Sequence, residues 1–136
     1  MSETSPETRS VIVEREIAHP PEKIWRALTQ PHLIEEWLMK NDFKPEVSHR
    51  FELRADWGAV ACEVLEIEPH RKLSYTWDAF GLESIVTWVL TPTSTGTHLR
   101  MEQSGFRIDQ RQAYGGAKAG WPQFFANLEQ ALARMD

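Results

Sequence analysis

Apolar and polar residues alternate at the start of the chain and again through its middle, which is the pattern of strands with one buried face. Val11, Val13 and Ile17 alternate with mostly polar neighbours and predict a first strand over residues 10–18. Five later runs carry a similar pattern and are separated by short turn sequences: residues 49–56, 59–68, 72–79, 83–91 and 96–104. Connections this short join antiparallel neighbours, so these runs predict an antiparallel meander.

Two short helices are expected between the first strand and the meander. The sequence His19-Pro20-Pro21-Glu22 ends the strand, and proline suits the first turn of a helix, so a helix begins here and runs to about Thr29. Pro31 then starts a second helix that runs to Leu38. A polar linker over residues 40–48 leads into the next strand.

Residues 109–135 predict a long C-terminal helix, about 40 Å in length at the usual rise per residue. Asp109 followed by Gln112 matches a capping box at its start. One apolar stripe with helical spacing runs along it, made of Tyr114, Ala117, Trp121, Phe124, Leu128, Leu132 and Met135.

The first half of this helix contains residues that weaken helical structure. Pro122 removes one helical hydrogen bond, and Gly115, Gly116 and Gly120 have low helix propensity. We therefore expect a kink or a loosened turn near Gly120.

Length and charge narrow the class of protein. With 136 residues, the chain has the length of one domain, and we expect that domain over residues 9–136 after a frayed N-terminal segment, residues 1–8. Six Trp and six Phe are an ample supply of large side chains for one core. The net charge is −5 and no basic cluster exists, which argues against nucleic-acid binding.

Several kinds of site and location lack support in the sequence. Cys62 is the only cysteine and the histidines lack metal-ligand spacing, so neither a disulfide nor a metal site is expected. No cofactor motif is present. No apolar run approaches the roughly 20 residues of a membrane span, and the first nine residues do not resemble a signal peptide. We therefore expect a cytoplasmic protein without a cofactor and without membrane contact.

A group of short motifs follows in a characteristic order. The segment REIAHPPEKIWRALTQP, residues 15–31, comes first, and further matches are Trp37, Val64-Leu65-Glu66-Ile67-Glu68-Pro69, Val86-Thr87-Trp88, Gly96-Thr97 and Gly120-Trp121. Together they resemble the activator of heat-shock-protein-90 ATPase homologue-like family, which belongs to the START-like, or polyketide-cyclase-like, superfamily (SRPBCC). The similarity extends from about residue 10 to residue 132.

The resemblance implies an α+β helix-grip fold. In this fold a curved antiparallel sheet wraps around a long C-terminal helix, two short helices follow the first strand, and a cavity lies between sheet and helix. It does not imply one function, because members of the superfamily include carriers of hydrophobic ligands, cyclases and proteins that sequester toxic metabolites.

The main candidates for a ligand site are large side chains on strand faces and on the helix stripe, which must face each other. Rings with a polar tip are good cavity linings, and the three glycines in the first half of the helix leave space beneath it. Plain core packing explains the same pattern, so both interpretations stay open. The set consists of Trp77, Trp88, Met101, Phe106, Tyr114 and Trp121.

Two further side chains have alternative roles. Gln103 lies on the inward face of its strand and is a candidate polar contact inside the cavity, unless it reaches solvent at the strand end. Cys62 lies within a strand, where a small buried apolar group is a better interpretation than a nucleophile.

We therefore favour reversible binding of a hydrophobic or aromatic small molecule, without bond chemistry. The alternative is a cyclase- or hydrolase-like enzyme that uses Tyr114 and Gln103, although no convincing acid or base stands out. A co-chaperone that stimulates a chaperone ATPase comes third, because the activators that give the family its name carry a separate N-terminal domain for which 136 residues leave no room. The sequence leaves the ligand and a homodimer open.

Overall fold

The computed structural model describes residues 8–135, which form the predicted α+β helix-grip fold. Seven strands make one antiparallel sheet in the order β1-β7-β6-β5-β4-β3-β2. The elements in chain order are β1 Thr8–Ile17, α1 Pro21–Thr29, α2 Pro31–Trp37, β2 Lys40–Asn41, β3 Arg50–Ala55, β4 Gly58–Glu68, β5 Lys72–Ala79, β6 Leu82–Pro92, β7 Thr97–Arg107 and α3 Arg111–Arg134.

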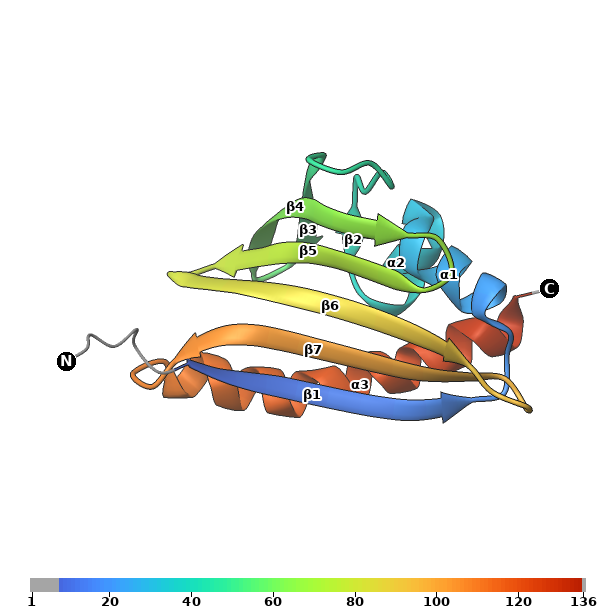
Figure 1. Cartoon of the computed structure of the whole chain (residues 1–136). Helices are drawn as coiled ribbons and strands as arrows, with labels where there is room; N and C mark the ends of the chain where they lie inside the picture. The colour runs from blue at the N-terminus through green and yellow to red at the C-terminus, as the bar shows by residue number, and fades with distance from the viewer. Residues whose placement is uncertain (1–7, 136) are drawn as a thin grey trace.

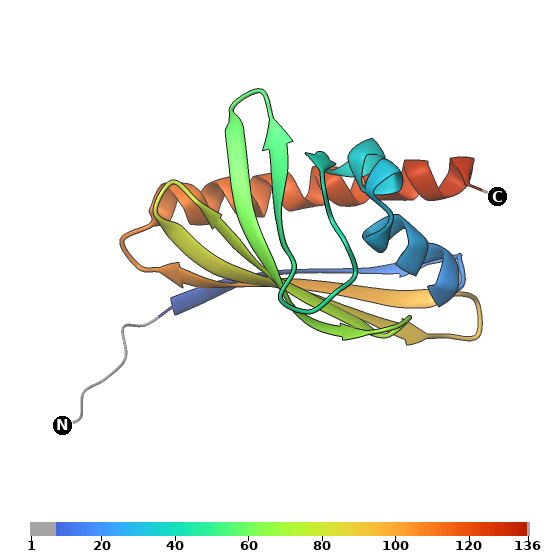
Figure 2. The ribbon, with the colours of Figure 1, turned by 90° about the horizontal axis from the view of Figure 1, so that it is seen from above.

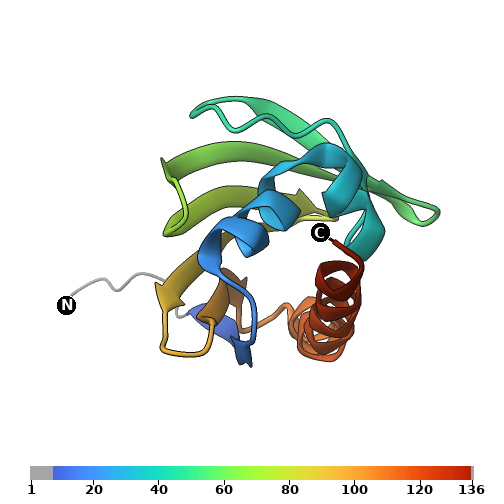
Figure 3. The same cartoon turned by 90° about the vertical axis from the view of Figure 1, so that its right-hand side faces the viewer.

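The sheet curves around α3, which runs along its length (Figure 1). Seen end-on, α3 lies on the concave side, and α1 and α2 cover the near end of the sheet (Figure 3). The hairpin of β3 and β4 extends on the side where α3 lies (Figure 2). No helix within residues 8–135 combines the length and the apolar character that a membrane span requires.

The two short helices form where the prolines predicted them. Pro21 and Pro31 occupy the first positions of α1 and α2, where the missing amide hydrogen costs no helical bond. The indole Nε1 of Trp37 donates a hydrogen bond of 2.8 Å to the carbonyl oxygen of Ala27 and so fixes α2 against α1.

A buried ring cluster joins these helices to the sheet and to α3. Trp88 on β6 is completely buried, and its ring lies 5.6 Å from that of Trp37 and 5.8 Å from that of Trp121. Its Nε1 donates to the hydroxyl of Tyr75 on β5 at 3.0 Å. Burial raises the pKa of Tyr75, so its phenol stays protonated.

Strand β7 continues three residues beyond the predicted end at residue 104, because of a bulge. Ser10 of β1 pairs with Ser104 and Arg9 pairs with Phe106, which leaves Gly105 as the extra residue. Gly105 has a φ of 109°, and a Cβ there would lie 2.8 Å from the carbonyl oxygen of Glu83. The bulge shifts the alternation by one residue and turns Phe106 inward, where it is fully buried.

Two local predictions are wrong. The linker over residues 40–48 contains the short strand β2, which pairs with β3 but is too brief to leave an alternating pattern. The capping box does not form, since α3 begins at Arg111 after Gln110, and Asp109 instead contacts Arg107 at 3.4 Å. The side chain of Gln110 accepts a hydrogen bond of 2.9 Å from the Arg107 amide, which closes the turn before the helix.

Helix α3 is one unbroken helix of 24 residues with Pro122 inside it, so the loosened turn expected near Gly120 is not found. Packing of Trp121, Phe125 and Leu128 against the core holds the helical geometry through the proline. The N-terminal segment predicted to fray lies outside the described residues, except for Thr8, which starts β1.

Replacing Pro122 with Ala should stabilise the protein by about 1–3 kcal/mol, because the new amide can donate to the carbonyl of Lys118. Urea unfolding measures this gain, and amide exchange around Trp121 should slow with it. Gln123→Ala, at the neighbouring exposed position, is the control and should change little. A less stable Pro122→Ala protein would mean that the proline ring is needed to seat Trp121.

His98 on the outer face of the β1–β7 pair links two carboxylates. Its Nε2 lies 2.8 Å from Glu14 Oε1, and its Nδ1 contacts Glu16. Hydrogen bonds that the protonated His98 ring donates to Glu16 and Glu14 raise the pKa of His98 above its ordinary value near 6.5.

Because the folded state holds the His98 proton more tightly, the contacts of His98 with Glu14 and Glu16 should stabilise the protein at about pH 5.5. This stabilisation should be lost as the pH rises through the raised pKa of His98. The midpoint of urea unfolding of His98→Gln should therefore fall below that of the natural sequence at pH 5.5 and match it at about pH 9. A difference that is equal at both pH values would contradict this protonation-linked contribution. The effect should be small and sensitive to salt, since the group is partly exposed.

Candidate functional site

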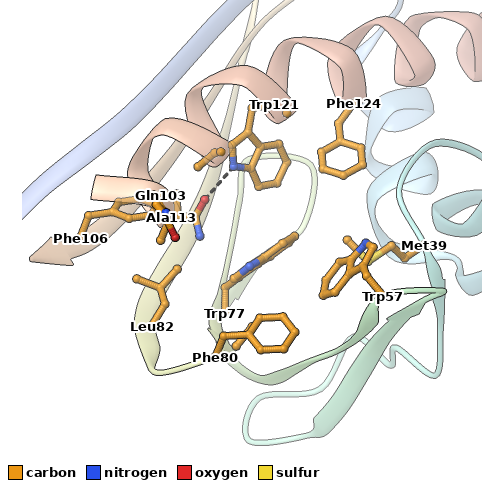
Figure 4. Close-up of a pocket in the computed structure, with 15 residues that line it drawn as sticks. Met39, Trp57, Trp77, Phe80, Leu82, Gln103, Phe106, Ala113, Trp121 and Phe124 are labelled. Carbon is orange, nitrogen blue, oxygen red and sulfur yellow. Dashed lines mark hydrogen bonds between the residues drawn. The ribbon is translucent and has the colours of Figure 1, made fainter. Parts of the chain in front are cut away.

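A pocket of about 460 Å³ lies between the first half of α3 and the ends of the strands that face it. Figure 4 shows α3 on one side, with Trp121 and Phe124, and Trp77, Phe80 and Trp57 on the other. The 15 lining residues are Met39, Trp57, Trp77, Ala79, Phe80, Leu82, Gln103, Phe106, Gln112, Ala113, Gly116, Ala117, Gly120, Trp121 and Phe124.

Gln103 is the fixed polar group of the pocket. It is buried, its Oε1 accepts a hydrogen bond of 2.7 Å from Trp121 Nε1, and its Nε2 donates to Ser84 Oγ at 3.0 Å. Ser84 Oγ in turn donates to the carbonyl oxygen of Trp77 at 2.7 Å. A glutamine amide has two N–H donors and an oxygen with two lone pairs, so one donor and one lone pair of Gln103 have no partner among the described residues.

Tryptophan rings form the inner wall of the pocket. Trp77 on β5 and Trp121 on α3 lie 5.4 Å apart by ring centroid, and Trp121 also contacts Phe124 at 5.4 Å. The indole of Trp121 is held by the bond to Gln103 and is packed on its other side against Trp88. The aromatic surface facing the pocket is therefore held rigidly in place.

Two glycines of α3 keep the helix side of the pocket open. A Cβ placed on Gly116 or Gly120 would meet no heavy atom within 4 Å, apart from the neighbouring chain and the helix backbone. Both glycines line the pocket, and neither contributes a side chain that would occupy it. The prediction that the glycines leave room beneath the helix is supported at Gly116 and Gly120, while Gly115 does not line the pocket.

Four of the predicted site residues line this pocket: Trp77, Gln103, Phe106 and Trp121. Trp88 and Met101 are fully buried in the core behind it. Tyr114 lies at a separate surface groove beside β1, where Arg9 Cζ and Lys118 Nζ each lie 5.5 Å from its ring centroid. The structure therefore divides the predicted set between pocket, core and a second groove.

The sequence analysis missed the residues at the mouth of the pocket. Trp57 and Phe80 come from hairpin tips and Met39 from the segment after α2, and none belongs to a regular apolar face. An aromatic residue directly before a glycine at a turn, as in Trp57-Gly58 and Phe80-Gly81, was the available signal. Phe124 was on the predicted helix stripe but was not singled out.

None of the 15 residues that line the pocket is an Asp, Glu, His, Lys, Arg, Cys or Tyr. Cys62 lies in the core, where burial raises the pKa of its thiol and keeps it protonated. Within residues 8–135 no group of three or more His, Cys, Asp or Glu side chains is placed to hold a metal ion. The polar side-chain groups that line the pocket are therefore the amides of Gln103 and Gln112 and the indole N–H groups of its tryptophans, and none of them is ionisable.

Comparison with known proteins identifies the family. The family model described as Activator of Hsp90 ATPase homolog 1-like protein matches residues 18–133. The chain belongs to this family. No curated protein matches the chain.

Several solved structures of other proteins resemble this chain. Protein MLL2253 from Mesorhizobium loti is 70% identical with a TM-score of 0.91, and the match covers 94% of this chain and 99% of that one. Protein BH1534 from Bacillus halodurans is 27% identical with a TM-score of 0.80, covering 91% and 96%. CalU16 from Micromonospora echinospora, at 23% identity and a TM-score of 0.81 over 93% and 78%, shares the fold.

Replacing Gln103 with Leu should destabilise the protein by about 1–3 kcal/mol, because the buried N–H of Trp121 loses its acceptor. The same change in a Trp121→Phe background, which has no such N–H, should cost at least about 1 kcal/mol less. Urea unfolding of the four proteins of this cycle measures the coupling. Gln112→Leu is the control at the other glutamine of the pocket, an exposed one, and should have little effect. Equal costs of Gln103→Leu in both backgrounds would contradict the proposed bond.

Proposed function

We propose that this protein reversibly binds an apolar, aromatic small molecule in the pocket between α3 and the sheet, without making or breaking a bond in it. The observation that carries the proposal is the lining of the pocket. Thirteen of its 15 side chains are aromatic, aliphatic or absent, and the two glutamines, Gln103 and Gln112, are the others. A volume near 460 Å³ lies within the roughly 300–1,000 Å³ that is usual for small-molecule sites.

The choice of an aromatic ligand rests on the geometry of the rings. Trp77 and Trp121 present ring surfaces to the same space, and aromatic partners gain about 0.5–1.5 kcal/mol per ring contact beyond the area they bury. The free donor and lone pair of Gln103 favour a ligand with one polar group, such as a hydroxyl or carbonyl, at the end that enters most deeply. A ligand that covered this amide without offering a polar partner would leave its remaining donor and lone pair unpaired, which costs binding free energy.

Binding is favoured over catalysis by the absence of an acid or base among the lining residues. The enzyme hypothesis relied on Tyr114 and Gln103 acting together. Only Gln103 lines the pocket, and Tyr114, whose ring contacts Phe106, lines the separate groove beside β1, with Arg9 and Lys118 near its ring. The family name refers to an activator of a chaperone ATPase. We favour small-molecule binding over that role because the candidate site is an apolar pocket.

The fluorescent probe 8-anilinonaphthalene-1-sulfonate tests the proposal, together with two glycine variants. Gly116→Leu should weaken probe binding at least tenfold, because its side chain fills the pocket. Gly115→Leu is the matched control, since it makes the same change on the same helical turn at a residue that does not line the pocket, and it should leave binding unchanged. Fluorescence titration gives both dissociation constants.

Thermal melts of the two variants decide whether the space is open. Removing a helical glycine should add about 0.8 kcal/mol of stability in each, whereas a leucine forced into packed core would cost about 1–3 kcal/mol. A strongly destabilised Gly116→Leu, or one that binds the probe as well as Gly115→Leu does, would sink the proposal. Native mass spectrometry of protein purified from its own host would then show whether a small molecule is retained at all.

A further inference from the structure

Phe80 adopts a conformation that does not suit phenylalanine. It occupies the first position of the two-residue turn between Ala79 and Leu82, which are paired across β5 and β6, and its φ is +52°. Gly81 follows with a φ of +84°, so both turn residues are left-handed, as in a type I′ hairpin. Asparagine or glycine is the usual residue at this position, because a side chain with a bulky ring is strained there.

The same ring is almost completely exposed. Phe80 has 83% of its surface accessible, the largest value among the exposed large apolar residues of the described chain. A large apolar ring in water and a strained backbone are both unfavourable for the isolated protein. Strain of this kind is found most often where a residue takes part in binding.

Trp57 meets Phe80 from a second hairpin. It lies in the turn between Ala55 and Gly58, which are paired across β3 and β4, and it is 54% exposed. The two rings have centroids 5.9 Å apart. Gly58 lies beneath the ring of Phe80, since a Cβ there would be 3.3 Å from the ring atom Cζ. We call Trp57 and Phe80 the rim pair.

The rim pair is part of the pocket and faces the helix. Both residues line the pocket, and Figure 4 shows them across from Trp121 and Phe124 of α3. The turn that carries Phe80 is also tied to the start of α3, because Gln110 Nε2 donates to the carbonyl oxygen of Gly81 at 3.2 Å. The position of Phe80 relative to the helix is therefore fixed by a direct bond.

We infer that the rim pair grips the outer end of the ligand, and that the ligand is a flat molecule with at least two ring systems. One ring system would lie inside, against Trp77 and Trp121, and the other between the rim pair and Phe124. This inference rests on the proposed function and adds to it both the contact residues at the mouth and the class of ligand. Binding then covers the ring surface of Phe80 that the contact with Trp57 leaves exposed, which accounts for its strained and exposed state.

The test replaces Phe80 with the residue that its turn prefers. Phe80→Asn should raise the melting temperature by about 2–6 °C, because the strain is relieved, and yet weaken binding of 8-anilinonaphthalene-1-sulfonate about two- to tenfold. This probe has two ring systems, as the inference requires. Phe80→Tyr keeps the ring and should bind as the natural sequence does. Val47→Asn removes another exposed apolar side chain, 60% accessible and outside the pocket, and should have no effect on binding.

The outcomes distinguish a failure of the rim-pair inference from a failure of the proposed function. Unchanged binding in Phe80→Asn, together with lost binding in Gly116→Leu, would overturn the role of the rim pair and leave the proposed function standing. Unchanged binding in Gly116→Leu would overturn the proposed function, and this inference with it. Equal weakening by Val47→Asn and Phe80→Asn would mean that the probe adheres to exposed apolar surface, and a lower melting temperature for Phe80→Asn would remove the argument from strain.

Discussion

The edge-to-face contacts of the buried indole of Trp88 hold the layers of this protein together. Its ring meets Trp37 from α2 and Trp121 from α3, and its N–H bonds to Tyr75 on the neighbouring strand. One side chain thus sets the separation of the sheet from two different helices, in the arrangement that aromatic quadrupoles favour. Because Trp121 is held from behind in this way, its other face is presented to the pocket in a fixed orientation.

The pocket lies along the half of α3 that contains the glycines. In the second half of the helix, Phe125, Leu128 and Leu132 fill the space against the core completely. In the first half, Gly116 and Gly120 contribute no side chain, and the pocket lies beside them. An apolar pocket of this size is typical of small-molecule sites, which supports the proposed role in binding.

Polar groups in the pocket are few, and their geometry is strongly restrained. Gln103 is held from both sides by Trp121 and Ser84, so its amide cannot turn to meet a ligand of arbitrary shape. The bulge at Gly105 places Phe106 on the inward face next to it. Specificity would therefore come from a rigid inner end of the pocket and from a mouth formed by two hairpin tips.

Periodicity alone was enough for the elements that bury one face. Alternation in the strands and the stripe on α3 report burial directly, because side chains that face the core must be apolar. The prolines mark the starts of α1 and α2 for a different reason, since proline suits the first helical position. Inward-facing positions such as Trp77, Gln103 and Trp121 could be chosen for the same reason. Only the tertiary structure separated pocket from core: Trp88, Met101 and Trp77 share one pattern, yet only Trp77 has open space in front of it. That distinction depends on which side chains of α3 stand opposite each residue. The contact between Trp57 and Phe80 depends on how two successive hairpins lie side by side. Neither is a property of local sequence.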